Sequence, residues 1–332
     1  MKKTISFPTA TTGYMALLSF VLLTMTACSY KDDGVLIVAE AVPSRGYNYP
    51  YFLYLPAEMD MKNPVFIIAE GNNSGFANDD FQEHKDKAKR TASLDYYLGN
   101  YVSRELNYPL LVPVFPRTRS EWKIYSHSLD RDAVLLKNHE MERIDLQLLA
   151  MLADATGKLD SMGYKVHDQI LMTGFSASGT FANRFTAIHP DKVYAMAAGG
   201  VNGLLFLPTP QLDSTSLIYP VGTSDFDQIF GKPFDLEAYK NTPQFLFMGQ
   251  QDDNDAIPYD DGYDKEERNI IYQVLGQKMQ PDRWTRCMEL YRNFNVQAEI
   301  NTYPQTGHEH PESIKNDIVG FFRKHLPQAE KP

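Results

Sequence analysis

The chain has 332 residues, of which 43% are hydrophobic, enough to bury one large core. Its formal net charge of -10 disfavours nucleic acid and anionic lipid headgroups as partners. Two cysteines are too few for a disulfide-rich framework. These properties favour a globular protein whose substrate or partner is not a polyanion.

The N-terminus reads as an export signal. Lys2 and Lys3 precede an apolar stretch at 14–25, too short and wrongly flanked for a permanent membrane span. The small residues before Cys28 resemble the bacterial lipoprotein box, which predicts a signal peptide at 1–27 and a lipidated Cys28. The alternative is cleavage nearby by the ordinary signal peptidase. Cleavage before Cys28 removes two lysines and no acids, so the net charge becomes -12.

The residues after Cys28 form a predicted tether at 28–34. Its acidic part, 29–33, resembles the export tag that follows the lipid cysteine in Bacteroidetes lipoproteins. This resemblance implies a protein anchored in the outer membrane by its lipid and displayed at the cell surface. With Cys28 lipidated, Cys287 has no partner and is expected to be a free, buried thiol.

Strands and helices are predicted to alternate along the chain, which favours a parallel sheet covered on both faces. Strands are predicted at 35–41, 51–54, 65–69, 110–114, 170–173, 193–198, 245–248 and 297–302. Helices are predicted at 91–106, 141–159, 177–188, 269–278, 282–293 and 313–325. The long connection at 199–242 is a candidate cap insertion over an active site.

The most informative stretch is Gly-Phe-Ser-Ala-Ser-Gly at 174–179, between a predicted strand and a predicted helix. A serine on such a turn is presented as a nucleophile, here Ser176. The motif departs from G-x-S-x-G at its last position, where Ser178 stands. The N-terminus of the following helix offers free N–H groups to a negative charge that develops on the substrate.

A carboxylate and a histidine follow at the ends of later strands. Asp252, Asp253 and Asp255 lie in the loop after the 245–248 strand, and His308 follows the last strand. An imidazole can accept the serine proton, and a carboxylate behind it fixes its tautomer. Asp252 is the predicted acid because it follows Gly249 after a short turn, and Asp255 is the alternative.

The order Ser, Asp, His resembles the α/β-hydrolase superfamily, from about residue 35 to 326. The resemblance implies a doubly wound, mostly parallel sheet with a small cap-like insertion, in one catalytic domain at 35–328. It also implies a triad of Ser176, Asp252 and His308 that needs neither a cofactor nor a metal. The backbone N–H groups of Ala177 and Asn72 are the expected oxyanion donors.

A narrower resemblance, to a family of secreted bacterial hydrolases, rests on four short stretches, at 219–222, 234–235, 249–255 and 283–284. It adds little about the substrate.

Other interpretations compete for some of these residues. The Gly-His-Glu-His run at 307–310 would suit a metal site, but no second His/Cys cluster completes a ligand set. The acids at 252–255 would suit a calcium loop, but the EF-hand alternation fails at Ala256. Aromatic residues of the insertion could line a pocket or form the insertion's own core (Tyr219, Phe226, Phe230, Phe234 and Tyr239).

Three function classes follow from these residues. The first is a serine hydrolase that cleaves carboxylic esters of a small molecule or an acylated glycan. The second is a serine peptidase of the prolyl-oligopeptidase type, which the short segment before the third strand disfavours. The third is a non-catalytic binding lipoprotein, which would have no need of Ser, Asp and His in this order.

Overall fold

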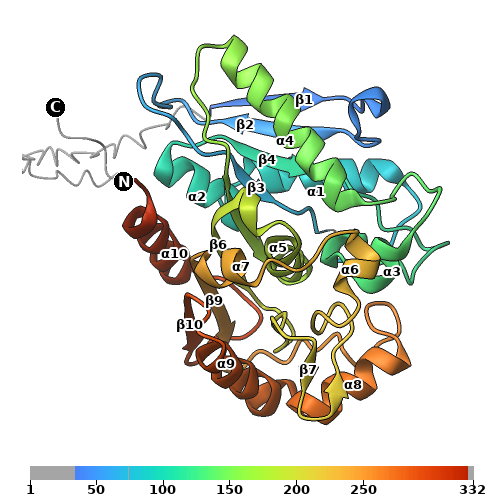
Figure 1. Ribbon diagram of the computed structural model, residues 1–332. Coiled ribbons are helices and arrows are strands. Elements are labelled where there is room, and N and C mark those ends of the chain that lie inside the picture. Colours follow the sequence, from blue (N-terminus) through green and yellow to red (C-terminus); the bar gives the residue numbers. More distant parts are fainter. Residues whose placement is uncertain (1–33, 74, 328–332) are drawn as a thin grey trace, which may run out of the picture. The chain divides into compact units, whose positions relative to one another are not determined.

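A computed structural model describes residues 34–73 and 75–327 (Figure 1). The predicted signal peptide, Cys28 and most of the tether lie outside the described residues. The main sheet has eight strands in the order β1-β2-β4-β3-β5-β6-β9-β10. Their bounds are β1 Val35–Ala39, β2 Tyr51–Leu55, β3 Ile68–Glu70, β4 Leu110–Pro113, β5 Ile170–Phe175, β6 Val193–Gly199, β9 Gln244–Gly249 and β10 Ala298–Tyr303.

The sheet is parallel from β4 to β10. β1 pairs antiparallel with β2, and β2 pairs antiparallel with β4. The remaining neighbours pair in parallel. Because parallel strands point the same way, the loops that follow β3, β5, β9 and β10 meet at one edge of the sheet, where ligands bind in open α/β sheets.

Helices cover both faces of this sheet. The helices are α1 Phe81–Ser93, α2 Leu98–Leu106, α3 Arg131–Leu135, α4 Ile144–Ser161, α5 Ala177–Ile188, α6 Phe226–Phe230, α7 Leu236–Asn241, α8 Lys265–Leu275, α9 Trp284–Asn293 and α10 Glu312–His325. One face packs against α1, α2 and α10, and α10 lies beside α2 (Figure 1). The other face packs against α4, α5 and α9.

Neighbouring residues of the buried strands divide between these two cores. In β2, Leu53 belongs to one core, and Phe52 and Tyr54 belong to the other. This alternation follows from the twofold period of side chains along a strand. It explains why the central strands read as continuous apolar runs in the sequence.

The prediction of one helix at 91–106 was wrong. The chain is extended at Leu94 and at Tyr97, so α1 ends at Ser93 and α2 begins at Leu98. A side-chain hydrogen bond across this break helps to hold it, because Asn100 Nδ2 donates to the Ala92 carbonyl at 2.7 Å. The predicted helix also missed the start of α1, where the Asp80 carboxylate accepts a hydrogen bond from the Gln82 N–H.

The candidate cap insertion at 199–242 carries a two-stranded sheet, β7 Gln211–Leu212 and β8 Thr215–Ser216, together with α6 and α7. Its aromatic side chains pack on one another and are almost fully buried, apart from the half-buried Phe234. They form a core for the insertion.

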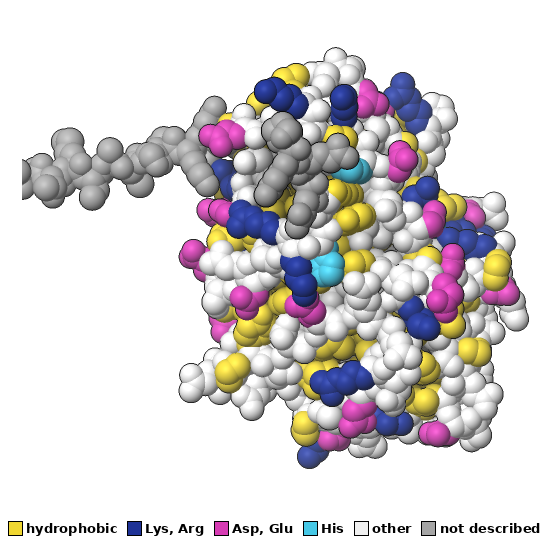
Figure 2. All heavy atoms as spheres, turned by 60° about the vertical axis from the view of Figure 1, so that its left-hand side comes forward, with side chains coloured by type: hydrophobic (Ala, Val, Ile, Leu, Met, Phe, Trp, Pro, Cys, Tyr) yellow, Lys and Arg dark blue, Asp and Glu magenta, His cyan; other side chains and the backbone are white. Residues whose placement is uncertain are grey.

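On the face shown in Figure 2, acidic and basic side chains are interspersed with apolar ones. No helix in the described ranges is long and apolar enough to cross a membrane.

Candidate active site

Ser176 lies at the turn between β5 and α5, with φ 61° and ψ -127°. A non-glycine residue in this region carries strain of about 1–3 kcal/mol, which persists where the surrounding structure enforces it. The close packing of the turn enforces it here. A Cβ atom on Gly174 would lie 2.1 Å from the Ser178 carbonyl oxygen, and one on Gly179 would lie 2.5 Å from the Gly199 carbonyl oxygen.

The two serines of the motif have different surroundings. Ser178 is buried, and its hydroxyl donates to the Phe175 carbonyl at 2.9 Å and accepts from the Phe175 N–H at 3.0 Å. The Ser176 side chain is half-buried and lines a cavity. Ser178 therefore holds the turn, and Ser176 is the hydroxyl in position to react.

His308 follows β10 and bonds to the acid predicted for it. Its Nδ1 lies 2.9 Å from Asp252 Oδ2, and Asp252 is buried at the end of β9. Asn254 Nδ2 lies 3.2 Å from His308 Nε2. Because the carboxylate can only accept and the amide NH₂ can only donate, these partners assign the proton to Nδ1 and the lone pair to Nε2. That tautomer is the one a general base needs.

The other acids of this loop point elsewhere. Asp255 Oδ2 forms an ion pair with the fully buried Arg283 at 2.6 Å, and Asp255 Oδ1 accepts from the Ile257 N–H. Asp253 is exposed. Asp252 is thus the only one of the three with a hydrogen bond to His308 among the described contacts. The Arg283–Asp255 pair instead joins the start of α9 to the acid loop.

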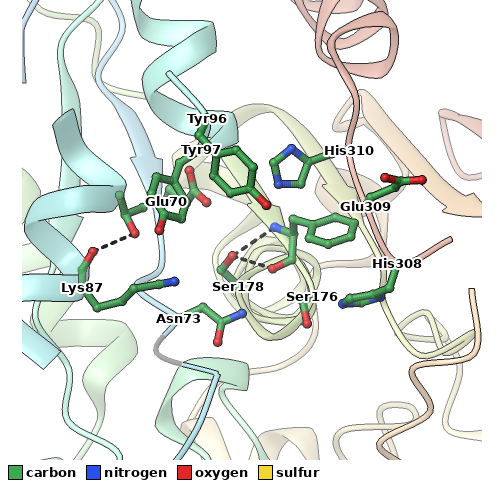
Figure 3. Close-up of a pocket in the computed structure, with 12 residues that line it drawn as sticks. Glu70, Asn73, Lys87, Tyr96, Tyr97, Ser176, Ser178, His308, Glu309 and His310 are labelled. Atoms are coloured by element: carbon green, nitrogen blue, oxygen red, sulfur yellow. Dashed lines mark hydrogen bonds between the residues drawn. The ribbon is translucent and has the colours of Figure 1, made fainter. Parts of the chain in front are cut away.

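Ser176 and His308 line the same cavity of about 250 Å³, and the imidazole lies toward the serine hydroxyl (Figure 3). The Phe175 ring packs on His308 at 4.6 Å between ring centroids. The remaining lining residues come from β3 and the loop after it, from α1 and the segment after it, from α5, and from the loop after β10: Glu70, Asn73, Lys87, Thr91, Tyr96, Tyr97, Ser178, Glu309 and His310. No lining residue in the described ranges comes from 199–242.

The expected oxyanion donors lie in two places. Ala177 is the first residue of α5, where backbone N–H groups have no partner within the helix. Asn72 is buried, and its side chain bonds to the backbone of Phe115 and lies 3.2 Å from His127 Nε2. The residue of this loop that lines the cavity is Asn73. The side chain of Asn72 therefore shapes the loop, and Asn73 is the residue at the cavity wall.

The sequence analysis assigned no role in the site to several ionisable residues of the cavity, among them Glu70 and His310. Glu70 ends β3 and is 4% exposed, and burial raises its pKa to about 7 although the Gly99 N–H bonds to its carboxylate. Burial lowers the pKa of His310 to about 4. Glu70 could have been identified from the sequence, because it is a charged residue directly after the apolar run of a predicted strand. His310 stood in the run considered for metal binding.

Buried polar residues near the site form a structural network. His127 Nε2 lies 2.7 Å from the Phe115 carbonyl, and burial lowers the histidine pKa to about 3. Arg131 pairs with Asp225 at 2.6 Å, which ties α3 to the insertion. Across the described residues, no cluster of three or more His, Cys, Asp or Glu side chains is arranged to hold a metal ion. Cys287 is a free, buried thiol.

Comparison with solved structures identifies the architecture. The poly(aspartic acid) hydrolase-1 from Sphingomonas sp. KT-1 matches with a TM-score of 0.53 and 16% identity, over 89% of this chain and 97% of that chain. The poly(3-hydroxybutyrate) depolymerase LpqC from Bordetella parapertussis matches with a TM-score of 0.51 and 16% identity, over 89% and 91%. No family model and no curated protein matches the sequence.

Proposed function

The chain has the α/β-hydrolase fold, and we propose that it is a serine hydrolase that cleaves carboxylic esters through an acyl-enzyme. The observation that carries this proposal is the shared cavity of Ser176 and His308, with Asp252 bonded to the far nitrogen of the imidazole. A strained serine, a base in the correct tautomer and a buried carboxylate are the three parts that nucleophilic acyl transfer requires.

In the first half of the reaction, His308 Nε2 takes the proton of Ser176 as the serine oxygen attacks the ester carbonyl carbon. The carbonyl electron pair moves onto oxygen. Backbone N–H groups of Ala177 and of the loop after β3, which contains Asn72 and Asn73, stabilise the negative charge that forms there. When this intermediate collapses, the alcohol leaves with the proton from His308. Water then attacks the acyl-serine by the same route, which releases the acid and restores Ser176.

The choice of ester over amide rests on the small size of the cavity, about 250 Å³. The two similar solved structures are named for hydrolysis of poly(aspartic acid) and depolymerisation of poly(3-hydroxybutyrate). At 16% identity these names guide the choice of assays and do not assign the substrate.

Activity-based labelling provides the test. The protein from residue 28 onward should react with a fluorophosphonate probe and hydrolyse short acyl esters faster than matched peptide amides. Ser176→Ala should lose both activities, and Ser178→Ala should still be labelled. Labelling that survives in Ser176→Ala would refute the assignment of the nucleophile, and faster amide cleavage would favour a peptidase.

We also propose that the protein is a lipoprotein anchored through Cys28 and displayed at the outer surface of the outer membrane. The support is the apolar stretch at 14–25, the small residues before Cys28 and the acidic residues after it. Such a location would place the enzyme where acylated glycans are accessible.

A further inference from the structure

Polar side chains form one wall of the cavity at Ser176. This wall lies opposite the serine and contains Glu70, Lys87, Tyr96 and Tyr97 (Figure 3). Thr91 also lines the cavity. These groups form hydrogen bonds to water when the cavity is open. An alkyl chain placed here would displace that water and offer no hydrogen bonds in return, which costs free energy. The wall therefore favours a substrate that brings polar atoms of its own.

Lys87 is the cation of this wall. It comes from the last half of α1, is half-buried, and extends toward the cavity (Figure 3). Its ammonium lies 5.0 Å from the centre of the Tyr97 ring, and no acidic group of the described residues lies within ion-pair distance of it. A cation–π contact leaves N–H donors unused, so the ammonium can still bind an anion.

Two acids lie near this charge, and neither forms an ion pair with it among the described residues. Glu309 is exposed to solvent at the cavity. Glu70 is buried, and its carboxylate accepts a hydrogen bond of 2.6 Å from the Gly99 N–H at the N-terminus of α2. The approach is close enough that a Cβ atom on residue 99 would lie 2.5 Å from the Glu70 carboxylate oxygen. Burial raises the pKa of Glu70 to about 7, although the Gly99 N–H and the nearby Lys87 charge both favour its ionised form. In its protonated form, Glu70 can donate a hydrogen bond to an incoming carboxylate.

Building on the ester hydrolase proposed above, we propose that the substrate carries a carboxylate near its ester bond, and that Lys87 binds this carboxylate. The cavity of about 250 Å³ is smaller than most ligand pockets, which run from ~300 to 1,000 Å³. The group it accepts is therefore short, as in the half-ester of a small dicarboxylic acid or the ester of a small hydroxy acid.

Matched pairs of small esters test this inference. Methyl hydrogen succinate and methyl succinamate differ only by carboxylate against amide on the acyl side, and O-acetylglycolate and O-acetylglycolamide differ in the same way on the alcohol side. The wild type should show a higher kcat/KM for the anionic member of at least one pair, by roughly 10- to 100-fold. This is the range that a charge-assisted hydrogen bond contributes.

Three variants separate a binding role of Lys87 from a structural one. Lys87→Met should lose most of the preference for the anion, and Lys87→Arg should retain it because the charge remains. Lys89→Met is the matched control, since Lys89 lies on the same helix, is exposed and does not line the cavity. A preference that is absent in the wild type, or that persists in Lys87→Met, would overturn the inference.

A binding measurement keeps the inference testable without hydrolysis. In the Ser176→Ala protein, methyl hydrogen succinate should bind more tightly than methyl succinamate by ligand-observed NMR, and adding Lys87→Met should remove the difference. Equal binding of both esters would overturn the inference. Anion-selective binding in a protein that neither labels nor hydrolyses esters would refute the proposed function alone.

Discussion

At the residue scale, three acids compete for one role, and the structure gives each a different environment. Asp252 bonds to His308, Asp253 is exposed, and Asp255 pairs with Arg283. Substitutions in this loop should therefore separate catalysis from stability.

Asp252→Asn should lower kcat by about 10⁴-fold with little loss of stability, because an amide at this position permits the wrong imidazole tautomer. Asp253→Asn is the control and should have a mild effect. Asp255→Asn should instead lower the free energy of unfolding by about 2–4 kcal/mol, since it leaves the guanidinium of Arg283 buried without its partner. Ester kinetics and urea unfolding measure the two effects. An Asp255→Asn protein that is inactive but as stable as the wild type would assign the role of catalytic acid to Asp255.

Glu70 makes a second prediction, on pH. Its pKa is about 7 in the folded protein against an ordinary value of 4.5, so folding favours the protonated form. The associated stability is fully present below pH 4.5 and is lost as the pH rises to about 7. Glu70→Gln does not titrate and retains an acceptor for the Gly99 N–H.

The stability of Glu70→Gln relative to the wild type should therefore increase between pH 4.5 and pH 8, by about 3 kcal/mol in order of magnitude. Urea unfolding at both pH values measures the change. The other buried acids are present in both proteins, so their contributions to the pH dependence of stability cancel in the comparison. A difference that is independent of pH would show that folding does not raise the pKa of Glu70.

At the element scale, the β5–α5 turn depends on two residues without side chains. The Cβ of an alanine at 179 would press on the Gly199 carbonyl of β6, and neither backbone can move without breaking the parallel pairing of β5 and β6. The strain at Ser176 is held by the same contacts.

Gly179→Ala should lower the free energy of unfolding by several kcal/mol and remove probe labelling of Ser176, because the turn must open. Gly157→Ala is the matched control within α4, where a Cβ meets no atom within 4 Å. That substitution should raise stability by about 0.5–1 kcal/mol, since alanine restricts the unfolded chain and favours the helix. Thermal unfolding of both variants measures the contrast. A Gly179→Ala protein with normal stability and labelling would contradict the packing argument.

At the scale of the whole molecule, the lipid anchor proposed at Cys28 makes a prediction about where the protein is held. Mass spectrometry of the native protein should find acylated Cys28 at the N-terminus, and Cys28→Ala should release the protein from membranes. Protease treatment of intact cells should remove it if it faces outward. An unmodified N-terminus at another residue would refute lipidation while leaving the hydrolase proposal intact.

The sequence by itself determined the eight strands of the main sheet and the identities of Ser176 and His308 as the residues to examine. Local signals suffice for these, because hydrophobic period and turn residues act over a few positions of the chain. The helix α5 begins at Ala177 and ends at Ile188, as expected from those signals. The break between α1 and α2 was missed in part because a contact distant in sequence, from the Gly99 N–H to Glu70, helps to hold it.

Only the tertiary structure decided which acid faces His308 and which groups surround Ser176. Sequence patterns do not distinguish between Asp252, Asp253 and Asp255. In the structure, Asp255 is set apart by its ion pair with Arg283, which lies on a different element. The cavity joins Glu70 and Lys87 to residues more than 80 positions away. Such groups meet because parallel strands bring their carboxyl ends to one edge of the sheet, and the burial that sets the pKa of Glu70 arises only when the helices close over that edge.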